Sequence, residues 1–246
     1  MPSLNEEKNL SEAVKNVIRG FERFSINGEI IVVNDGSSDN TGTIAEELSI
    51  SYPFVRVLHH ELPQGIGGSF WDGVGNASGE IVTMIPGDGE NDAAEILRYL
   101  PLMEQVDMVV PFIYNRGVRS FRRRLLSIVY REIIKLSFGL SLNYMNGTVM
   151  YRRNIFQGIT LKAGGFFYQT ELLVKTILRG YLYAEVPCAL LQRGSGESKA
   201  TTFKSLVRVS LAYLGLLKEV YAGKGRPIGL AEDSATYRRR RELETF

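Results

Sequence analysis

The chain has 246 residues, of which 44% are apolar and 23% are charged, a composition that excludes an intrinsically disordered protein. Its net charge of +2 gives no reason to expect a nucleic-acid partner. Cys188 is the only cysteine, so an intramolecular disulfide and a cysteine-based metal cluster are excluded, and a cytoplasmic location is expected.

Helices and strands are predicted to alternate through the first half of the chain. Amphipathic spacing predicts helices at residues 6–21, 41–48, 65–77 and 92–103, and Asp39 or Thr41 can cap the second. Short apolar runs predict strands at residues 29–34, 54–59, 80–85 and 106–113. Such alternation implies an α/β fold with a mostly parallel sheet flanked by helices.

The second half of the sequence is less regular. Helices are predicted at residues 119–138, 168–179 and 203–221, with a strand at 181–186. Residues 223–246 are polar and are predicted to form a flexible tail. Polar residues 5–8 are incompatible with a secretory signal, and no run of 18 apolar residues occurs, so we expect no membrane span.

Two loops rich in turn residues and carboxylates follow predicted strands, at residues 34–41 and 86–92. Ligands of open parallel sheets bind outside the carboxyl ends of the strands, so both loops are expected to lie in one cleft. Asp88 and Glu90 flank a glycine and could converge on Mg²⁺ or Mn²⁺, although a solvated turn is the alternative. Asp35 could bind a base or ribose, or could cap a turn.

Four segments occur in an order and spacing that resemble those of family 2 glycosyltransferases. They are PSLNEE at residues 2–7, VVNDGSSDNT at 32–41, QGIGGSFWDGVGNASGE at 64–80 and PGDGE at 86–90. The branch that the chain resembles is that of dolichyl-phosphate mannose synthases, and the similarity extends to about residue 221. The resemblance implies a GT-A fold in one domain at residues 1–222, with a nucleotide-binding half at about 1–113 and an acceptor half at about 114–222.

The resemblance also implies roles for individual residues. Asp88 and Glu90 would hold Mg²⁺ or Mn²⁺ on the diphosphate of a nucleotide-sugar donor. The nucleotide would be bound by a set of residues from three segments: Pro2, Leu4, Glu6, Asp35, Gly65 and Gly67.

Three later residues also match positions of the branch: Arg193 and Lys199 are expected to belong to the nucleotide-sugar-binding set, and Glu171 to lie on the acceptor side. Arg193 and Lys199 lie in a glycine-rich loop and would face phosphate oxygens, although an exposed basic loop is the alternative. Glu171 could act as a base for a hydroxyl acceptor, or could be a first-turn glutamate that favours the helix dipole.

The sequence departs from the family pattern at four places. No hydrophobic strand precedes Pro2, so we expect a sheet that lacks its first strand, and we favour a reading frame that begins too late over a compromised sheet. Asn34 replaces the first of two adjacent aspartates in the family's base-binding motif. Glu90 replaces the second aspartate of the family's metal-binding Asp-x-Asp motif. Asn143 and Asn146 stand where the branch often has Asp and Ser, which leaves the acceptor open.

The sequence thus predicts a metal-dependent, inverting glycosyltransferase that uses a UDP- or GDP-sugar. The acceptor would be a polyprenyl phosphate or a cell-envelope glycan. The alternatives are a catalytically impaired partner subunit and a sugar nucleotidyltransferase. The basic helix from Arg119 to Lys135 could lie on a membrane surface, or could be a packed helix with a solvated basic face.

Overall fold

A computed structural model describes residues 1–115, 121–189, 203–222 and 229–244. The first half alternates as predicted, in the order β1 (Pro2–Ser3), α1 (Leu10–Phe24), β2 (Ile30–Asn34), α2 (Thr41–Ser51), β3 (Val55–His59), α3 (Ile66–Asn76), β4 (Ile81–Thr83), α4 (Ala93–Leu97), η1 (Leu100–Glu104) and β5 (Met108–Ile113). The second half holds α5 (Phe121–Phe138), β6 (Met150–Arg152), η3 (Arg153–Phe156), α6 (Tyr168–Leu178), β7 (Tyr183–Cys188), α7 (Phe203–Tyr221) and α8 (Ala235–Glu244).

The strands form two adjoining sheets. The first is fully parallel and has the order β1-β2-β3. The second has the order β4-β6-β5-β7, in which β5 and β7 are parallel and β6 runs antiparallel to both of its neighbours. The predicted mostly parallel sheet is therefore confirmed, with β6 as an antiparallel insertion that the sequence did not reveal.

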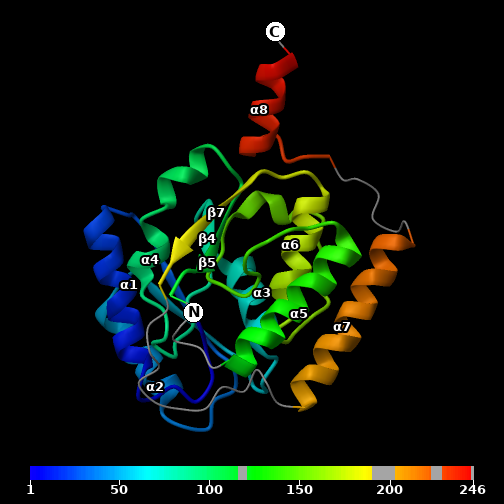
Figure 1. Ribbon diagram of the computed structural model, residues 1–246. Coiled ribbons are helices and arrows are strands. Elements are labelled where there is room, and N and C mark those ends of the chain that lie inside the picture. The colour runs from blue at the N-terminus through cyan, green and yellow to red at the C-terminus, as the bar shows by residue number, and fades with distance from the viewer. Residues whose placement is uncertain (116–120, 190–202, 223–228, 245–246) are drawn as a thin grey trace.

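Two apolar cores lie on opposite faces of the sheets. Alternate residues of one strand point to opposite faces, and β5 accordingly contributes Met108 and Val110 to one core and Val109 to the other. The first core is built with α3, α5, α6 and α7, and the second with α1, α2 and α4. Figure 1 shows the same division, with α1, α2 and α4 on one side of the strands and α5, α6 and α7 on the other.

Three predicted elements differ from the structure. The expected sheet without a first strand instead has a short β1, which pairs with Val33 and Asn34 of β2. The predicted helix at residues 92–103 ends at Leu97 and continues as the 3₁₀ helix η1, because Pro101 cannot donate an α-helical hydrogen bond.

The third difference is at the carboxyl end of the chain. The flexible tail predicted for residues 223–246 is wrong for its described part, because Ala235–Glu244 form the helix α8. Its first turn is anchored by Asp107, whose carboxylate accepts hydrogen bonds from the N–H groups of Ala235 (2.7 Å) and Thr236 (3.0 Å). Beyond that turn α8 projects from the rest of the molecule (Figure 1).

Candidate functional site

The two carboxylate-rich loops meet at β1. The Asp35 N–H donates to the carbonyl of Ser3 at 2.9 Å, and the Gly87 N–H donates to the carbonyl of Pro2 at 3.0 Å. The loop after β2 and the loop after β4 therefore flank the same two residues. The two carboxylate-rich loops therefore lie close together at the carboxyl ends of the strands, as expected, and each is hydrogen-bonded to a residue of β1.

The segment after β1 is fastened to the loop at residues 37–41. The N–H groups of Asn5, Glu6 and Glu7 donate to side-chain oxygens of that loop at 3.0, 2.8 and 3.2 Å, with Ser37, Thr41 and Asp39 as the acceptors. Asn5 adopts a positive φ of 57°, a conformation that asparagine tolerates well.

The residues expected at the nucleotide in this segment have distinct environments. Pro2 is buried, whereas Leu4 and Glu6 are half-buried. The Glu6 carboxylate accepts a hydrogen bond from the Asn9 side chain at 2.8 Å, so it is engaged at the start of α1. Of the three, Leu4 offers a partly exposed apolar surface next to the loops.

Asp35 is buried and its carboxylate is surrounded by donors. One oxygen accepts from the Gln64 N–H at 2.7 Å and lies 2.8 Å from Nδ1 of His60, and the other accepts from the Gly65 N–H at 2.8 Å. Burial acts to raise the pKa of Asp35, but the hydrogen bonds from His60, Gln64 and Gly65 outweigh it and hold the pKa below its ordinary value. The carboxylate therefore stays ionised and fixes the segment that leads into α3.

His60 is a neighbour of Asp35 that the sequence motifs did not single out. Its side chain is 8% exposed, and its Nε2 lies 3.0 Å from a carboxylate oxygen of Asp72 on α3. The ring thus bridges two carboxylates from different elements. Its place directly after β3, at the carboxyl edge of the sheet, was the available signal.

Gly65 and Gly67 lie where α3 begins and where the segment at residues 163–164 packs against it. Gly65 has a φ of +87°, which disfavours any other residue, and the Gly67 N–H donates to the carbonyl of Gly164 at 2.8 Å. A side chain at Gly67 would collide with the carbonyl of Ala163. Both glycines therefore allow close backbone approach beside the Asp35 loop.

Asp88 and Glu90 lie on a tight turn after β4. Gly89 between them has a φ of +71°, and Oδ1 of Asp88 accepts the N–H of Glu90 at 3.0 Å. Nothing lies within 4 Å of a Cβ built on Gly89, so the turn is open on that side. Both acidic side chains are half-buried rather than splayed into solvent.

The donor set of this turn fits a hard divalent cation. Mg²⁺ is usually held by one or two carboxylates together with waters and substrate phosphates, rather than by a complete protein cage. Among the described residues no three His, Cys, Asp or Glu side chains group closely enough to hold a metal alone. Two carboxylates with an open side match that pattern.

Glu171 lies in the first turn of α6 and is 3% exposed. Its carboxylate accepts from the N–H groups of Lys162 (3.0 Å) and Ala163 (2.8 Å), and it pairs with Nζ of Lys175 at 2.7 Å. Both oxygens are thus committed to the loop that meets Gly67. This geometry favours a positioning role over that of a base for an acceptor.

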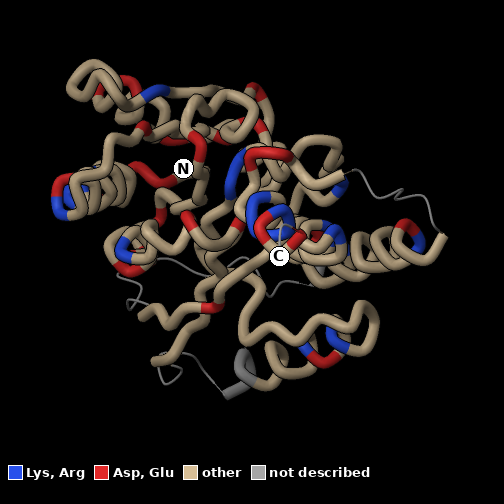
Figure 2. Tube along the Cα trace, turned by 90° about the horizontal axis from the view of Figure 1, so that it is seen from above, with Lys and Arg blue, Asp and Glu red and all other residues tan. Residues whose placement is uncertain are grey.

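Arg193 and Lys199, the two expected phosphate contacts, lie outside the described residues. Within the described part of the chain, no helix is long and apolar enough to cross a membrane. Figure 2 shows acidic and basic residues interspersed around the molecule.

Comparison with known proteins identifies the family. Residues 1–167 match Glycosyl transferase family 2. The chain is 29% identical over 212 residues to polyprenol monophosphomannose synthase of Mycolicibacterium smegmatis, a match that covers 81% of this chain and 78% of the relative. It is 27% identical over 207 residues to dolichol-phosphate mannosyltransferase of Pyrococcus furiosus, covering 81% of this chain and 57% of that protein.

Solved structures agree on the fold. The structure of glucosyl-3-phosphoglycerate synthase from Mycobacterium tuberculosis with Mg²⁺ and uridine diphosphate has a TM-score of 0.66 at 21% identity, covering 88% of this chain and 77% of that one. The same enzyme with Mn²⁺, UDP-glucose and phosphoglyceric acid has a TM-score of 0.64 at 21% identity, with the same coverage. The predicted GT-A fold is confirmed, and the match over residues 1–167 shows that this chain belongs to glycosyltransferase family 2.

Proposed function

We propose that this glycosyltransferase moves a sugar from a nucleoside-diphosphate sugar to a polyprenyl phosphate, at the surface of a membrane. The observation that carries the proposal is the convergence of the Asp35 loop and the Asp88 loop on Pro2 and Ser3. That convergence sets the residues that would border the nucleotide beside two carboxylates suited to a divalent cation.

Each group near the two carboxylate loops would have a distinct task. Asp88 and Glu90 would hold Mg²⁺ or Mn²⁺, which when bound neutralises the charge that develops on the departing nucleoside diphosphate. Pro2, Leu4 and Glu6 would border the nucleotide from the amino-terminal segment. Asp35 acts through the backbone it holds, since it fixes Gly65, which with Gly67 would form the opposite border.

The acceptor side is argued from the chemistry of a phosphate nucleophile. A phosphate is already an anion and needs no general base, so catalysis rests on positioning and on stabilising the leaving group. This agrees with the surroundings of Glu171, whose carboxylate already accepts a backbone hydrogen bond and forms an ion pair with Lys175. On the donor side, Arg193 and Lys199 would contribute cationic contacts to the phosphate oxygens of the nucleotide sugar.

An apolar surface on α5 and α7 supports a lipid-linked acceptor. The two helices lie side by side, joined by a 2.7 Å hydrogen bond between the hydroxyls of Ser137 and Tyr213 (Figure 1). Among the side chains that the structure describes on these helices, the exposed aliphatic ones are Leu125, Leu126, Ile128, Val129, Ile133 and Leu136 on α5, and Leu206, Val207, Leu211 and Leu214 on α7. Exposed Lys135, Arg208 and Lys218 add positive charge suited to anionic headgroups.

The test is a transfer assay. Purified protein would receive labelled GDP-mannose or UDP-glucose, vesicles that contain a polyprenyl phosphate, and either Mn²⁺ or a chelator. We expect labelled lipid that depends on the cation. Turnover by Asp88→Asn should fall about 100-fold or more, since a principal electrostatic contact is removed. Glu104→Gln, at an exposed carboxylate after α4, is the matched control and should keep full activity.

Other outcomes would point elsewhere. Release of pyrophosphate from a nucleoside triphosphate would indicate a sugar nucleotidyltransferase. Failure of the folded chain to bind either nucleotide would indicate a catalytically impaired partner subunit. Transfer that survives the chelator and Asp88→Asn unchanged would contradict the assigned metal site.

A further inference from the structure

The side chain of His60 is buried between the loop after β2 and the helix α3. The N–H of His60 donates to the carbonyl of Asn34 at 2.9 Å, so its backbone continues the pairing of β3 with β2. Neighbouring residues of an extended segment point to opposite sides. The ring of His59 is accordingly 44% exposed beside Glu46 of α2, whereas the ring of His60 is buried and faces α3.

Both nitrogens of the His60 ring lie at hydrogen-bonding distance from a carboxylate. Nδ1 lies 2.8 Å from an oxygen of Asp35, and Nε2 lies 3.0 Å from an oxygen of Asp72. An ionised carboxylate only accepts hydrogen bonds, so both contacts are hydrogen bonds at once only when both nitrogens carry a proton. Hydrogen bonds with an ionised partner are roughly twice as strong as those between neutral groups. The geometry therefore suits a positively charged ring.

The two carboxylates hold α3 at two points on one of its sides. Asp35 accepts the N–H of Gly65, which directly precedes the helix, at 2.8 Å. Asp72 follows Gly65 after about two turns, or roughly 10 Å along the helix axis. One attachment would leave the helix able to tilt, whereas two attachments at this spacing fix its direction. His60 provides the second attachment, since it joins Asp72 to Asp35.

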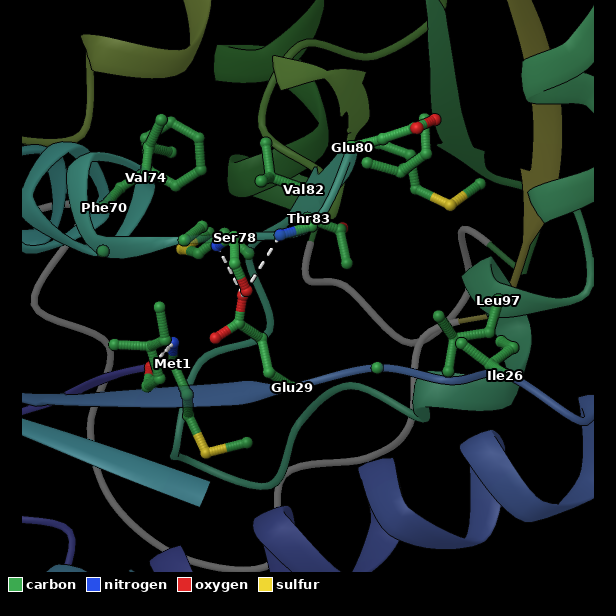
Figure 3. Close-up of a pocket in the computed structure, with 18 of the residues that line it drawn as sticks. Met1, Ile26, Glu29, Phe70, Val74, Ser78, Glu80, Val82, Thr83 and Leu97 are labelled. Carbon is green, nitrogen blue, oxygen red and sulfur yellow. Dashed lines mark hydrogen bonds between the residues drawn. The ribbon is translucent and has the colours of Figure 1, made fainter. Parts of the chain in front are cut away.

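This side of α3 is separate from the side that borders a cavity of about 520 Å³ (Figure 3). Phe70 and Val74 line that cavity and lie one turn apart on one face of the helix. Asp72 stands midway between them in sequence, which in a helix of 3.6 residues per turn places it on the opposite face. The attachment through His60 therefore does not depend on what lies in the cavity.

The helix α3 has little stability of its own. Its 11 residues include Gly67, Gly68, Gly73 and Gly75. A glycine inside a helix costs about 1 kcal/mol relative to alanine. A helix of this composition depends on contacts with the rest of the protein for its position. Gly65 and Gly67 lie at its start, so the direction of the helix determines where their backbone groups stand.

We propose that His60 is a positioning residue for the nucleotide-sugar donor. Its charged ring, bonded to Asp35 and Asp72, sets the direction of α3 and with it the place of the glycines at the start of that helix. The inference rests on the proposed function, because that function assigns Gly65 and Gly67 to the nucleotide. Since the ring holds other residues and touches no reacting group, its loss should weaken donor binding and leave the chemical step nearly unchanged.

The experiment measures donor binding and steady-state turnover with GDP-mannose or UDP-glucose, Mn²⁺ and vesicles that contain a polyprenyl phosphate. His60→Gln removes the cation that bonds both carboxylates. We expect its KM for the donor to rise at least about fivefold, with kcat within about twofold of wild type. His60→Arg keeps a cation with several N–H groups and should recover most of the donor affinity. Glu61→Gln, at the exposed neighbouring carboxylate, is the control and should match wild type.

A second variant tests the same bridge from its partly exposed end. Asp72→Ala leaves the contact between His60 and Asp35 in place and should raise the KM by a similar factor. Combined with His60→Gln, it should add less than about twofold, because both changes remove one bridge. The Tm of each variant would be measured first, and the assays would be run well below the lowest value.

The outcomes separate this inference from the proposed function. If wild type binds neither donor, the proposed function fails, and the donor role of His60 fails with it. If wild type binds a donor and both His60→Gln and Asp72→Ala bind it equally well, only the positioning role is overturned. Independent, additive effects of the two changes, or a loss of kcat without a loss of affinity, would also contradict the bridge.

Discussion

Asp35 and Asp88 are carboxylates at the same edge of the sheet, and their surroundings prepare them for different tasks. Asp35 is 3% exposed and surrounded by donors from His60, Gln64 and Gly65. Asp88 lies on an open glycine turn. We therefore predict that Asp35 acts on a ligand through the loop that it holds, and that Asp88 contributes directly to the proposed cation site.

Asp35→Asn should lower the free energy of unfolding by about 1–3 kcal/mol. Only the oxygen of an amide accepts a hydrogen bond, so the N–H of either Gln64 or Gly65 would lose its acceptor. The wild-type carboxylate has a folded pKa below its ordinary value. Its contribution is therefore present above the unfolded pKa of about 3.9 and is lost as the pH falls through the folded value. Urea unfolding between pH 7 and pH 3 measures this.

The control for that measurement is Glu61→Gln, at an exposed neighbouring carboxylate. The difference in stability between wild type and Asp35→Asn should shrink as the pH falls below about 4, since both chains then lack the charge. A difference that stays constant across the range would show that ionisation of Asp35 contributes nothing.

At the scale of elements, one carboxylate joins α6 to α7 and to the loop beside α3. Glu171 holds the backbone at residues 162–163 and pairs with Lys175, which also lies 3.0 Å from Glu219 of α7. The loop it holds contacts Gly67 at the start of α3. A change at Glu171 should therefore reach Gly67, one of the residues proposed to border the nucleotide.

Glu171→Gln should lower the free energy of unfolding by about 1–3 kcal/mol and raise the KM for the nucleotide sugar, with kcat reduced less than tenfold. The physical reason is that an amide loosens the loop at residues 162–163 without removing a reacting group. Steady-state kinetics across pH checks this. If turnover instead fell by about 100-fold or more and the acidic limb of the pH profile disappeared, Glu171 would be identified as a general base.

An element could be predicted from the sequence when consecutive residues determine it, and not when contacts with distant residues do. The apolar run at β2 and the glycine-rich start of α3 carry their signals in consecutive residues. The strand β6 has only three residues, and its antiparallel pairing with β4 depends on contacts about 70 residues apart along the chain. The partners of Glu171 could not be inferred from its own helix, because a first-turn glutamate is equally suited to the helix dipole.

At the scale of the whole molecule, the apolar surface of α5 and α7 should bind vesicles. We expect the chain to co-sediment with anionic phospholipid vesicles, because exposed leucines enter the interface while Lys135, Arg208 and Lys218 meet the headgroups. Leu211→Glu combined with Leu214→Glu should reduce the bound fraction at least tenfold. Ile50→Glu, at an 84% exposed position on α2, is the control and should bind as wild type.

Equal binding by wild type, the double variant and the control would contradict a membrane contact through these helices. Donor binding by the double variant, measured without vesicles, should be unchanged, which separates loss of the surface from loss of the fold.

The sequence did not predict the helix α8, because the residues that hold this helix in place are distant from it along the chain. Residues 235–244 are polar enough to suggest a tail. Their helix is fixed because Asp107, at the amino end of β5, caps its first turn, and because the Leu182 N–H donates to the Thr236 hydroxyl at 2.7 Å. Neither partner is near in sequence.

The anchoring of α8 has a practical consequence. The strands β4 and β5 run in the same direction, since each is antiparallel to β6. Asp107 lies before β5 begins and Gly87 follows the end of β4, so α8 leaves the molecule on the side opposite the carboxylate loops. A sensor chip or resin that captures the protein through α8 would leave the carboxylate loops facing the bulk solution.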